Sequence, residues 1–167
     1  MNIPELFLME FDEEMPTTRR LLERVPEASF SWKPHEKSMT LQRLASHVAD
    51  LPMRCSAIIT LETFVRPVGA APFQASSTRD LLEHFDAAVA EARPALGSLR
   101  DDQLSATWTV KFGDRTIASL PRVMALRRVF MDHLIHHRAQ LGVYLRLLDV
   151  PLPGTYGPSA DEQLAAR

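Results

Sequence analysis

Three histidines form the pattern with the clearest chemical meaning in this sequence. His133 and His137 lie four residues apart in the segment DHLIHHRAQL, residues 132–141. A helix advances about 100° per residue, so both imidazoles would share one helix face and could reach a single ion. His47, on an earlier amphipathic stretch, is the candidate for a third ligand. The pattern predicts a metal site built from two distant segments.

The neighbours of His47 favour an inward position for this residue. On a helical projection it is the only polar member of an apolar stripe. The other members of that stripe are Leu44, Leu51 and Ile58. A buried imidazole there needs a partner. Pro52 cannot donate a hydrogen bond to the carbonyl of Val48, so we expect the helix to kink or restart close to His47.

Three neutral imidazoles suit a divalent transition ion such as zinc or nickel, and they leave coordination positions open to water or substrate. Open positions favour catalysis over a purely structural role. Histidines at this spacing also occur as solvated or hydrogen-bonded pairs, and that explanation stays open for the pair alone. The sequence therefore predicts a site that is catalytic if it holds a metal.

Other polar residues near the pair are candidates for supporting roles. His136 lies about 60° from His133 on the projection, so we expect it to flank the site rather than to coordinate, with Asp132 orienting it or an outer water. Gln140 and Tyr144 continue the histidine stripe. We expect these two residues to act in the catalytic pocket by positioning water or substrate.

The cysteine and the other two histidines discussed next are not expected to belong to the metal site. Cys55 is the only cysteine, which excludes an internal disulfide and a thiol-rich metal site. It lies about 80° round the helix from His47, and we expect a small buried filler rather than a nucleophile. His35 falls in a polar loop and is expected to be exposed, whereas His84 is expected to be structural.

Length and charge limit the classes of protein to which this sequence can belong. The 167 residues, 46% of them hydrophobic, predict one domain over residues 1–167. Lysine and arginine number 19 against 21 acidic residues, a formal charge of -2 that argues against a nucleic-acid groove. The sequence shows neither an export signal at its start nor an apolar run long enough to span a membrane, so we expect a cytoplasmic protein without membrane contact.

Helical spacing extends over four long segments, and this pattern predicts an all-α bundle. The predicted helices cover residues 4–24, 39–64, 78–97 and 120–149. Ser77 suits the start of the third. Between the third and fourth, residues 104–117 are β-branched and aromatic around Gly113-Asp114, which predicts a small β-hairpin.

The fourth predicted helix carries a second apolar strip, away from the histidines. The strip consists of Met131, Ile135, Ala139, Gly142 and Val143. A helix that is apolar on two sides has neighbours on both, so the strip predicts a homodimer. Packing of this strip inside the bundle, against another helix or the C-terminal tail, is an equal alternative.

Two segments together resemble the signatures of the DinB-like family. They are TLQRLASHVAD at residues 40–50 and DHLIHHRAQL at residues 132–141, and the resemblance extends to the ending GTYGPSADE at residues 154–162. It implies a four-helix bundle with up-down-down-up connectivity that binds a divalent metal through His47, His133 and His137. The family often has glycine where this sequence has Ala139, a small-for-small change.

The resemblance does not select one reaction, because that superfamily includes both bacillithiol-dependent S-transferases and mycothiol-dependent isomerases. Our leading hypothesis is a metal-dependent enzyme that transfers a low-molecular-weight thiol to an electrophilic small molecule, with the metal lowering the thiol pKa. The alternatives are a hydrolase that uses metal-bound water and a non-catalytic metal-binding bundle that acts through a partner.

Overall fold

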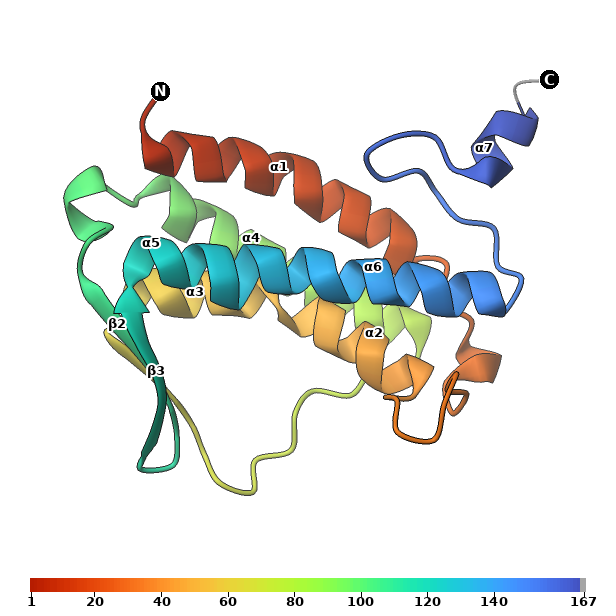
Figure 1. Ribbon diagram of the computed structural model, residues 1–167, viewed down its shortest axis with the longest axis horizontal. Coiled ribbons are helices and arrows are strands. Elements are labelled where there is room, and N and C mark those ends of the chain that lie inside the picture. The colour runs from red at the N-terminus through yellow and green to blue at the C-terminus, as the bar shows by residue number, and fades with distance from the viewer. Residues whose placement is uncertain (166–167) are drawn as a thin grey trace.

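The computed structural model describes the backbone of residues 1–165 and the side chains of residues 1–162. Most of this chain is helical, and a small sheet lies at one end (Figure 1). The helices are α1 (Ile3–Leu22), α2 (Leu41–Asp50), α3 (Pro52–Thr60), α4 (Thr78–Gly97), α5 (Arg122–Ala125), α6 (Asp132–Leu147) and α7 (Ala160–Ala165). A π-helical segment, Leu126–Met131, joins α5 to α6, and short 3-10 turns cover Glu27–Ser29 and Asp101–Gln103.

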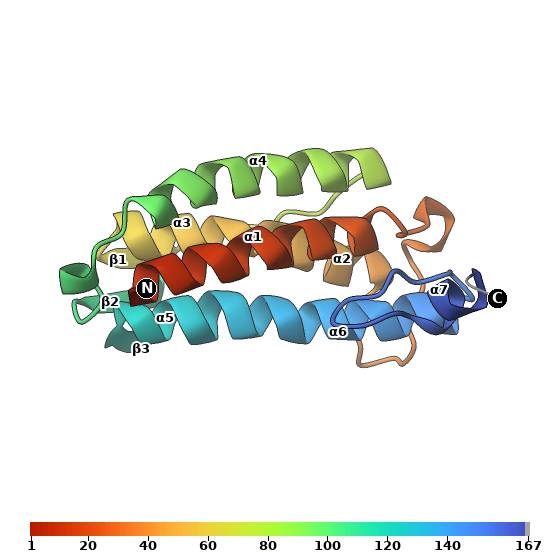
Figure 2. The same cartoon turned by 90° about the horizontal axis from the view of Figure 1, so that it is seen from above.

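Four long helical segments lie side by side in both views (Figures 1 and 2). They are α1, the α2–α3 pair, α4, and the continuous run from α5 through α6. In Figure 1, α1 and the α5–α6 run proceed from left to right, whereas α2–α3 and α4 proceed from right to left. Helix α4 packs on α1, α2 and α3, and α2 also packs on α6. The contact between α2 and α6 brings the two histidine-bearing segments together.

Helix starts follow local sequence signals. Asn2 and Glu5 form a reciprocal capping box at the start of α1, and the Thr40 side chain accepts a hydrogen bond from the backbone of Arg43 at the start of α2. Ser77 caps α4 through the Asp80 backbone N–H, as predicted. These caps satisfy backbone donors that have no partner within the helix.

The interior is apolar, and it holds the helices together through burial of large side chains. The largest fully buried residues include Phe11, Phe85, Trp108 and Phe130. The rings of Phe11 on α1 and Phe130 in the π-helical segment lie 5.9 Å apart between centroids. Within residues 1–165, no helix combines the length and the apolar character that a membrane span requires.

The predicted break near His47 is confirmed. Helix α2 ends at Asp50 and α3 begins at Pro52. Because Pro52 has no N–H, the Leu51 N–H bonds the Val48 carbonyl instead, at 3.4 Å. The predicted helix over residues 39–64 is too long, since α3 ends at Thr60 and the chain then becomes extended.

The predicted hairpin is confirmed, but the sheet is larger than the hairpin. Strands β2 (Thr107–Phe112) and β3 (Arg115–Pro121) pair antiparallel. Strand β1 (Thr63–Arg66) adds to β2 in parallel, with Thr63 opposite Thr109. The all-α expectation is therefore wrong in this detail: the fold is mostly helical with a three-stranded sheet of order β1-β2-β3.

The π-helical segment changes the orientation of the residues around His133. Hydrogen bonds of the i to i+5 type place one extra residue in a turn, so side chains on either side of it do not follow an ideal α-helical projection. Leu126, Phe130 and Met131 are fully buried, and the next buried positions are Leu134 and Arg138. Each metal-candidate histidine of α6 precedes one of these buried residues. The histidines consequently lie at the edge of the core, facing α2.

The C-terminal segment covers part of the second apolar strip of α6. Met131 is fully buried in the core, whereas Val143 is 60% exposed. Ile135, Ala139 and Gly142 line a cavity of about 370 Å³ whose other wall is the chain from Leu152 to Ser159. The tail, one of the two explanations left open by the sequence, therefore lies over part of the strip, where Ile135 and Gly142 are half-buried, but it leaves Ala139 exposed.

Candidate metal centre

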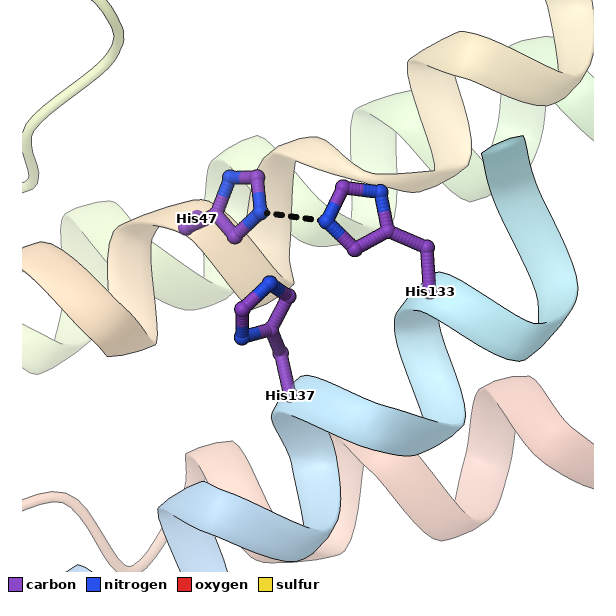
Figure 3. Close-up of side chains that lie close together, drawn as sticks. All are labelled: His47, His133 and His137. Atoms are coloured by element: carbon purple, nitrogen blue, oxygen red, sulfur yellow. Dashed lines mark hydrogen bonds between the residues drawn. The ribbon is translucent and has the colours of Figure 1, made fainter. Parts of the chain in front are cut away.

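The three histidines predicted as ligands meet between α2 and α6. Their rings point toward one another from the two helices (Figure 3). The Nε2 atoms of His47 and His133 are 3.2 Å apart, and one ligand-capable nitrogen from each of the three residues lies within 4.8 Å of the others. The ring centroids of His137 lie 4.6 Å and 4.7 Å from those of His47 and His133.

This arrangement fits a divalent metal. Two nitrogens bound tetrahedrally to zinc at 2.0–2.1 Å are separated by about 3.3 Å, close to the 3.2 Å between His47 and His133. All three rings are half-buried, so they are held in place yet reachable from one side. Nitrogen ligands of this type suit zinc, nickel and related ions.

Hydrogen bonds orient two of the three rings. Nδ1 of His137 donates to Oε1 of Gln140 at 2.7 Å, which leaves the lone pair on Nε2. The His133 ring hydrogen-bonds the backbone of Val129, within the π-helical segment, and its Nε2 faces His47. Such outer hydrogen bonds fix the tautomer that a metal requires.

The site favours uncharged imidazoles. Burial is the main cause that lowers the pKa of His47 to about 3, and the neighbouring His137 and His133 lower it further. Burial likewise lowers the pKa of His133 to about 4, helped by His137 and Arg54. Burial also lowers the pKa of His137, against the opposing hydrogen bond to Gln140. Neutral imidazoles are the form that binds metal.

These pKa values predict how acid affects the metal-free protein. The unfolded chain binds protons at histidine near pH 6.5, whereas folded His47 and His133 stay neutral to much lower pH. The unfolded state therefore binds more protons in this window, so the free energy of unfolding is greatest above about pH 6.5 and falls as the pH falls toward 4. Urea unfolding of metal-free protein across this range measures the slope.

His47→Gln isolates this contribution, because glutamine keeps a polar side chain of moderate size but does not titrate. The variant should lose stability less steeply than the native protein as the pH falls. Equal slopes for the two proteins would show that His47 does not contribute to the acid sensitivity.

Gln140 has a more specific position than the sequence indicated. The prediction placed it in the pocket, and the structure brings its amide oxygen to His137. Gln140→Ala should weaken zinc binding by about 10- to 100-fold, the range typical for loss of a residue that orients a ligand. Competition with a chromophoric chelator measures this effect. Gln140→Glu, which keeps an acceptor for the His137 N–H, should retain most of the affinity, and equal loss in both variants would contradict this role.

Tyr144 makes its contacts away from the three histidines, whereas His136 lies beside one of them. The Tyr144 hydroxyl donates to the Met39 carbonyl at 3.3 Å, and its ring packs edge-on against Trp32. These contacts do not bring Tyr144 to the three histidines. His136 is exposed, with its ring centroid 4.9 Å from that of His137, so it flanks the site as expected.

Asp132 does not orient His136 through any hydrogen bond within the described residues, and it pairs instead with Arg127 at 3.6 Å. Cys55 is fully buried, and burial raises the pKa of its thiol to about 12, so it is not a nucleophile. His35 is exposed, as expected. His84 has a structural role: its Nε2 bonds Asp50 at 3.0 Å, and its ring stacks on Phe73.

A cavity of about 400 Å³ opens beside His47. Its walls come from α2, α3, β1 and residues 70–73 of the chain that leads to α4. No motif in residues 70–73 predicts this role. Phe73, stacked on His84, and Ala75, whose N–H bonds Ser46 Oγ at 2.9 Å, hold the segment against the helices. Of the three histidines, His47 is the one that lines this cavity.

The fold and sequence match a known family. The profile described as DinB family matches residues 1–165. Solved structures of similar fold include a DinB-like protein from Bacillus cereus, which is 21% identical, has a TM-score of 0.70, and aligns over 91% of this chain and 97% of its own. They also include a DinB-like protein from Bacillus subtilis, which is 24% identical, has a TM-score of 0.65, and aligns over 91% of this chain and 99% of its own. A search of curated proteins finds no match. Because the family profile covers nearly the whole chain, and both signature segments contribute to the histidine cluster, this protein belongs to the DinB family.

Proposed function

We propose that this protein is a cytoplasmic enzyme that uses a divalent transition metal, zinc or nickel, to transfer a low-molecular-weight thiol to an electrophilic small molecule, as in a detoxification or stress response. The observation that carries the proposal is the convergence of His47, His133 and His137 beside an open cavity. A site with three protein ligands and an accessible side is typical of catalytic rather than structural metal centres.

The bound ion would supply one chemical effect, a lower pKa for a thiol or water that reaches it. The protein residues supply the rest. Gln140 holds His137 in the tautomer that presents Nε2, and residues 70–73 form one wall of the cavity beside His47. A thiol from outside the chain is needed as the nucleophile, because the only cysteine, Cys55, is buried and protonated at neutral pH.

The test compares nucleophiles on one metal-loaded preparation. Glutathione, bacillithiol, mycothiol and water are each supplied with a panel of electrophiles and a panel of esters, and product formation is followed by mass spectrometry. Thiol adducts that disappear in His47→Ala support the transferase. Ester hydrolysis that is independent of thiol would replace this proposal with the hydrolase alternative, and inactivity with every pair would favour the non-catalytic bundle.

We further propose that the four long helical segments form a single domain with the up-down-down-up connectivity of a four-helix bundle, and that two copies associate through the exposed part of α6. Val143 and Leu147, 60% and 59% exposed, support this association. Light scattering after size-exclusion chromatography should give twice the chain mass, and Val143→Lys should lower it. A monomer well above micromolar concentration would contradict the dimer.

A further inference from the structure

The cavity beside His47 combines apolar walls with several positive charges. Its apolar lining includes Met53, Ala57, Leu61 and Phe64. The same cavity is lined by Arg43, Arg54 and Arg66. A concave apolar pocket with a few convergent polar groups is the usual form of a small-molecule site. Its volume of about 400 Å³ suits a small organic ligand.

The charges of the three arginines that line the cavity lack close partners, whereas several other arginines are paired. Arg19, Arg93 and Arg127, for example, each form a hydrogen-bonded ion pair with a carboxylate. Across the described side chains, the guanidinium groups that line the cavity form no hydrogen bond and no ion pair within 4.0 Å. Three cationic groups around one pocket attract an anion.

Arg54 is the most constrained of the three. It is partly buried, and its Nε–H is enclosed without an acceptor among the described residues. Arg54 also lies close enough to the histidines that its charge, after burial and the neighbouring imidazoles, contributes to lowering the pKa values of His47, His133 and His137. A guanidinium that is partly removed from water costs free energy unless a partner compensates it.

Acidic residues of the cavity compensate this charge only in part. Asp50 favours the charged form of Arg54 through space, but it lies beyond ion-pair distance and accepts a hydrogen bond from His84. Glu91 is exposed. Positive groups consequently outnumber negative ones around the cavity, and Arg54 has no direct partner within the described residues.

We propose that this cavity binds a small molecule that carries a carboxylate, which the Arg54 guanidinium holds while the thiol of the same molecule faces the three histidines. Guanidinium and carboxylate match in shape and charge and form strong paired hydrogen bonds. The inference rests on the proposed function for the identity of the reacting group. It predicts that a carboxylate-bearing thiol, such as glutathione or bacillithiol, is preferred over mycothiol, which has no carboxylate.

The test uses two thiols that differ only in charge, 3-mercaptopropionate and 3-mercaptopropionamide. Each is titrated into cobalt-substituted protein, and the change in the cobalt absorption spectrum gives the dissociation constant. The acid should bind about tenfold more tightly than the amide, as expected for loss of a charged hydrogen bond. The preference should fall to less than about twofold in Arg54→Gln and persist in part in Arg54→Lys.

Arg79→Gln is the matched control, because Arg79 lies on the surface of α4 and pairs with Glu83. It should keep the full preference for the acid. Circular dichroism and thermal melting confirm that each variant is folded. If Arg54→Gln does not fold, the preference for the acid is compared between Arg54→Lys and the native protein instead. Equal binding of acid and amide, or a preference that survives in Arg54→Gln, would overturn the inference while leaving thiol binding at the metal intact.

A separate measurement distinguishes failure of the inference from failure of the proposed function. If neither thiol changes the cobalt spectrum, the proposed thiol chemistry is wrong. Metal-free protein is then titrated with succinate and with succinamide, and the NMR resonance of the Arg54 Nε–H group is followed. A saturating shift with succinate alone supports the carboxylate site, whereas no shift, or equal shifts with both compounds, overturns it.

Discussion

Replacing His47 by alanine is expected to weaken zinc binding by more than about 100-fold. The substitution removes one of three nitrogens that lie within 4.8 Å of one another, whereas loss of a mere orienting residue costs 10- to 100-fold. His137→Ala should have an effect of similar size, because its ring comes from the other helix and completes the same cluster. Competition with a chromophoric zinc chelator at pH 7 gives the affinity of each protein.

His35→Ala is the matched control for this experiment. His35 is exposed in the loop before α2, where its Nδ1 accepts a hydrogen bond from the backbone N–H of Lys37. The control should bind zinc as the native protein does. If His35→Ala lost as much affinity as His47→Ala, zinc would be bound by surface histidines and the cluster would not be the site.

Arg138→Met is expected to destabilise the protein by about 3–5 kcal/mol, the usual cost of removing one partner of a buried ion pair. Arg138 on α6 pairs with Glu14 on α1, and their side chains are only 3% and 9% exposed. The Tyr156 hydroxyl accepts from Arg138 Nη2 and donates to Glu14 Oε1, each at 2.8 Å. The substitution leaves Glu14 without its countercharge. Urea unfolding measures the change in free energy.

Arg146→Gln provides the comparison, because Arg146 is also on α6 and also binds the C-terminal segment. Its partner Asp161 is partly exposed, as is Arg146 itself, and exposed pairs contribute about 0–1 kcal/mol. The double variant Glu14→Leu with Arg138→Met should recover much of the stability lost by Arg138→Met, since no unpaired charge remains. A loss below about 1 kcal/mol for Arg138→Met would contradict a structural role for the buried pair.

The parts of this protein that the sequence predicts are those governed by local pattern. The spacing of His133 and His137 places both rings on one face wherever the segment is helical, and Pro52 breaks a helix because it lacks an N–H. Both predictions are confirmed. The hairpin around Gly113 follows from a turn signal between β-branched residues, and Gly113 does adopt a positive φ of 55°.

The parts that the sequence does not predict depend on contacts between distant residues. Strand β1 forms because Thr63 meets Thr109, a pairing that no local signal specifies. The π-helical segment before His133 has no sequence signature that we could use, yet it rotates the histidines to the edge of the core. The acceptor role of Gln140 toward His137 follows from three-residue spacing and could have been inferred.

The position of Arg54 near the histidines is only partly predictable from the sequence. It lies seven residues after His47, which on a continuous helix would place the two side chains within about 20° of each other. The seven-residue spacing therefore predicts that Arg54 lies near His47 if the helix is continuous. Because Pro52 interrupts the helix between them, the spacing alone does not fix their relative orientation. The lack of a partner for the Arg54 guanidinium among the described residues emerges only when α2, α3 and the chain toward α4 are assembled.

The central claim, that imidazoles from α2 and α6 hold one metal ion with part of its surface open, is tested most directly by X-ray absorption on protein purified without a histidine tag. Elemental analysis should give one divalent transition ion per chain, and the fine structure should fit three imidazole nitrogens, at about 2.0–2.1 Å if the ion is zinc, plus lighter scatterers from solvent. The same measurement on His47→Ala should show little bound metal. A native protein without metal, or one whose metal keeps the same nitrogen shell in His47→Ala, would contradict the account.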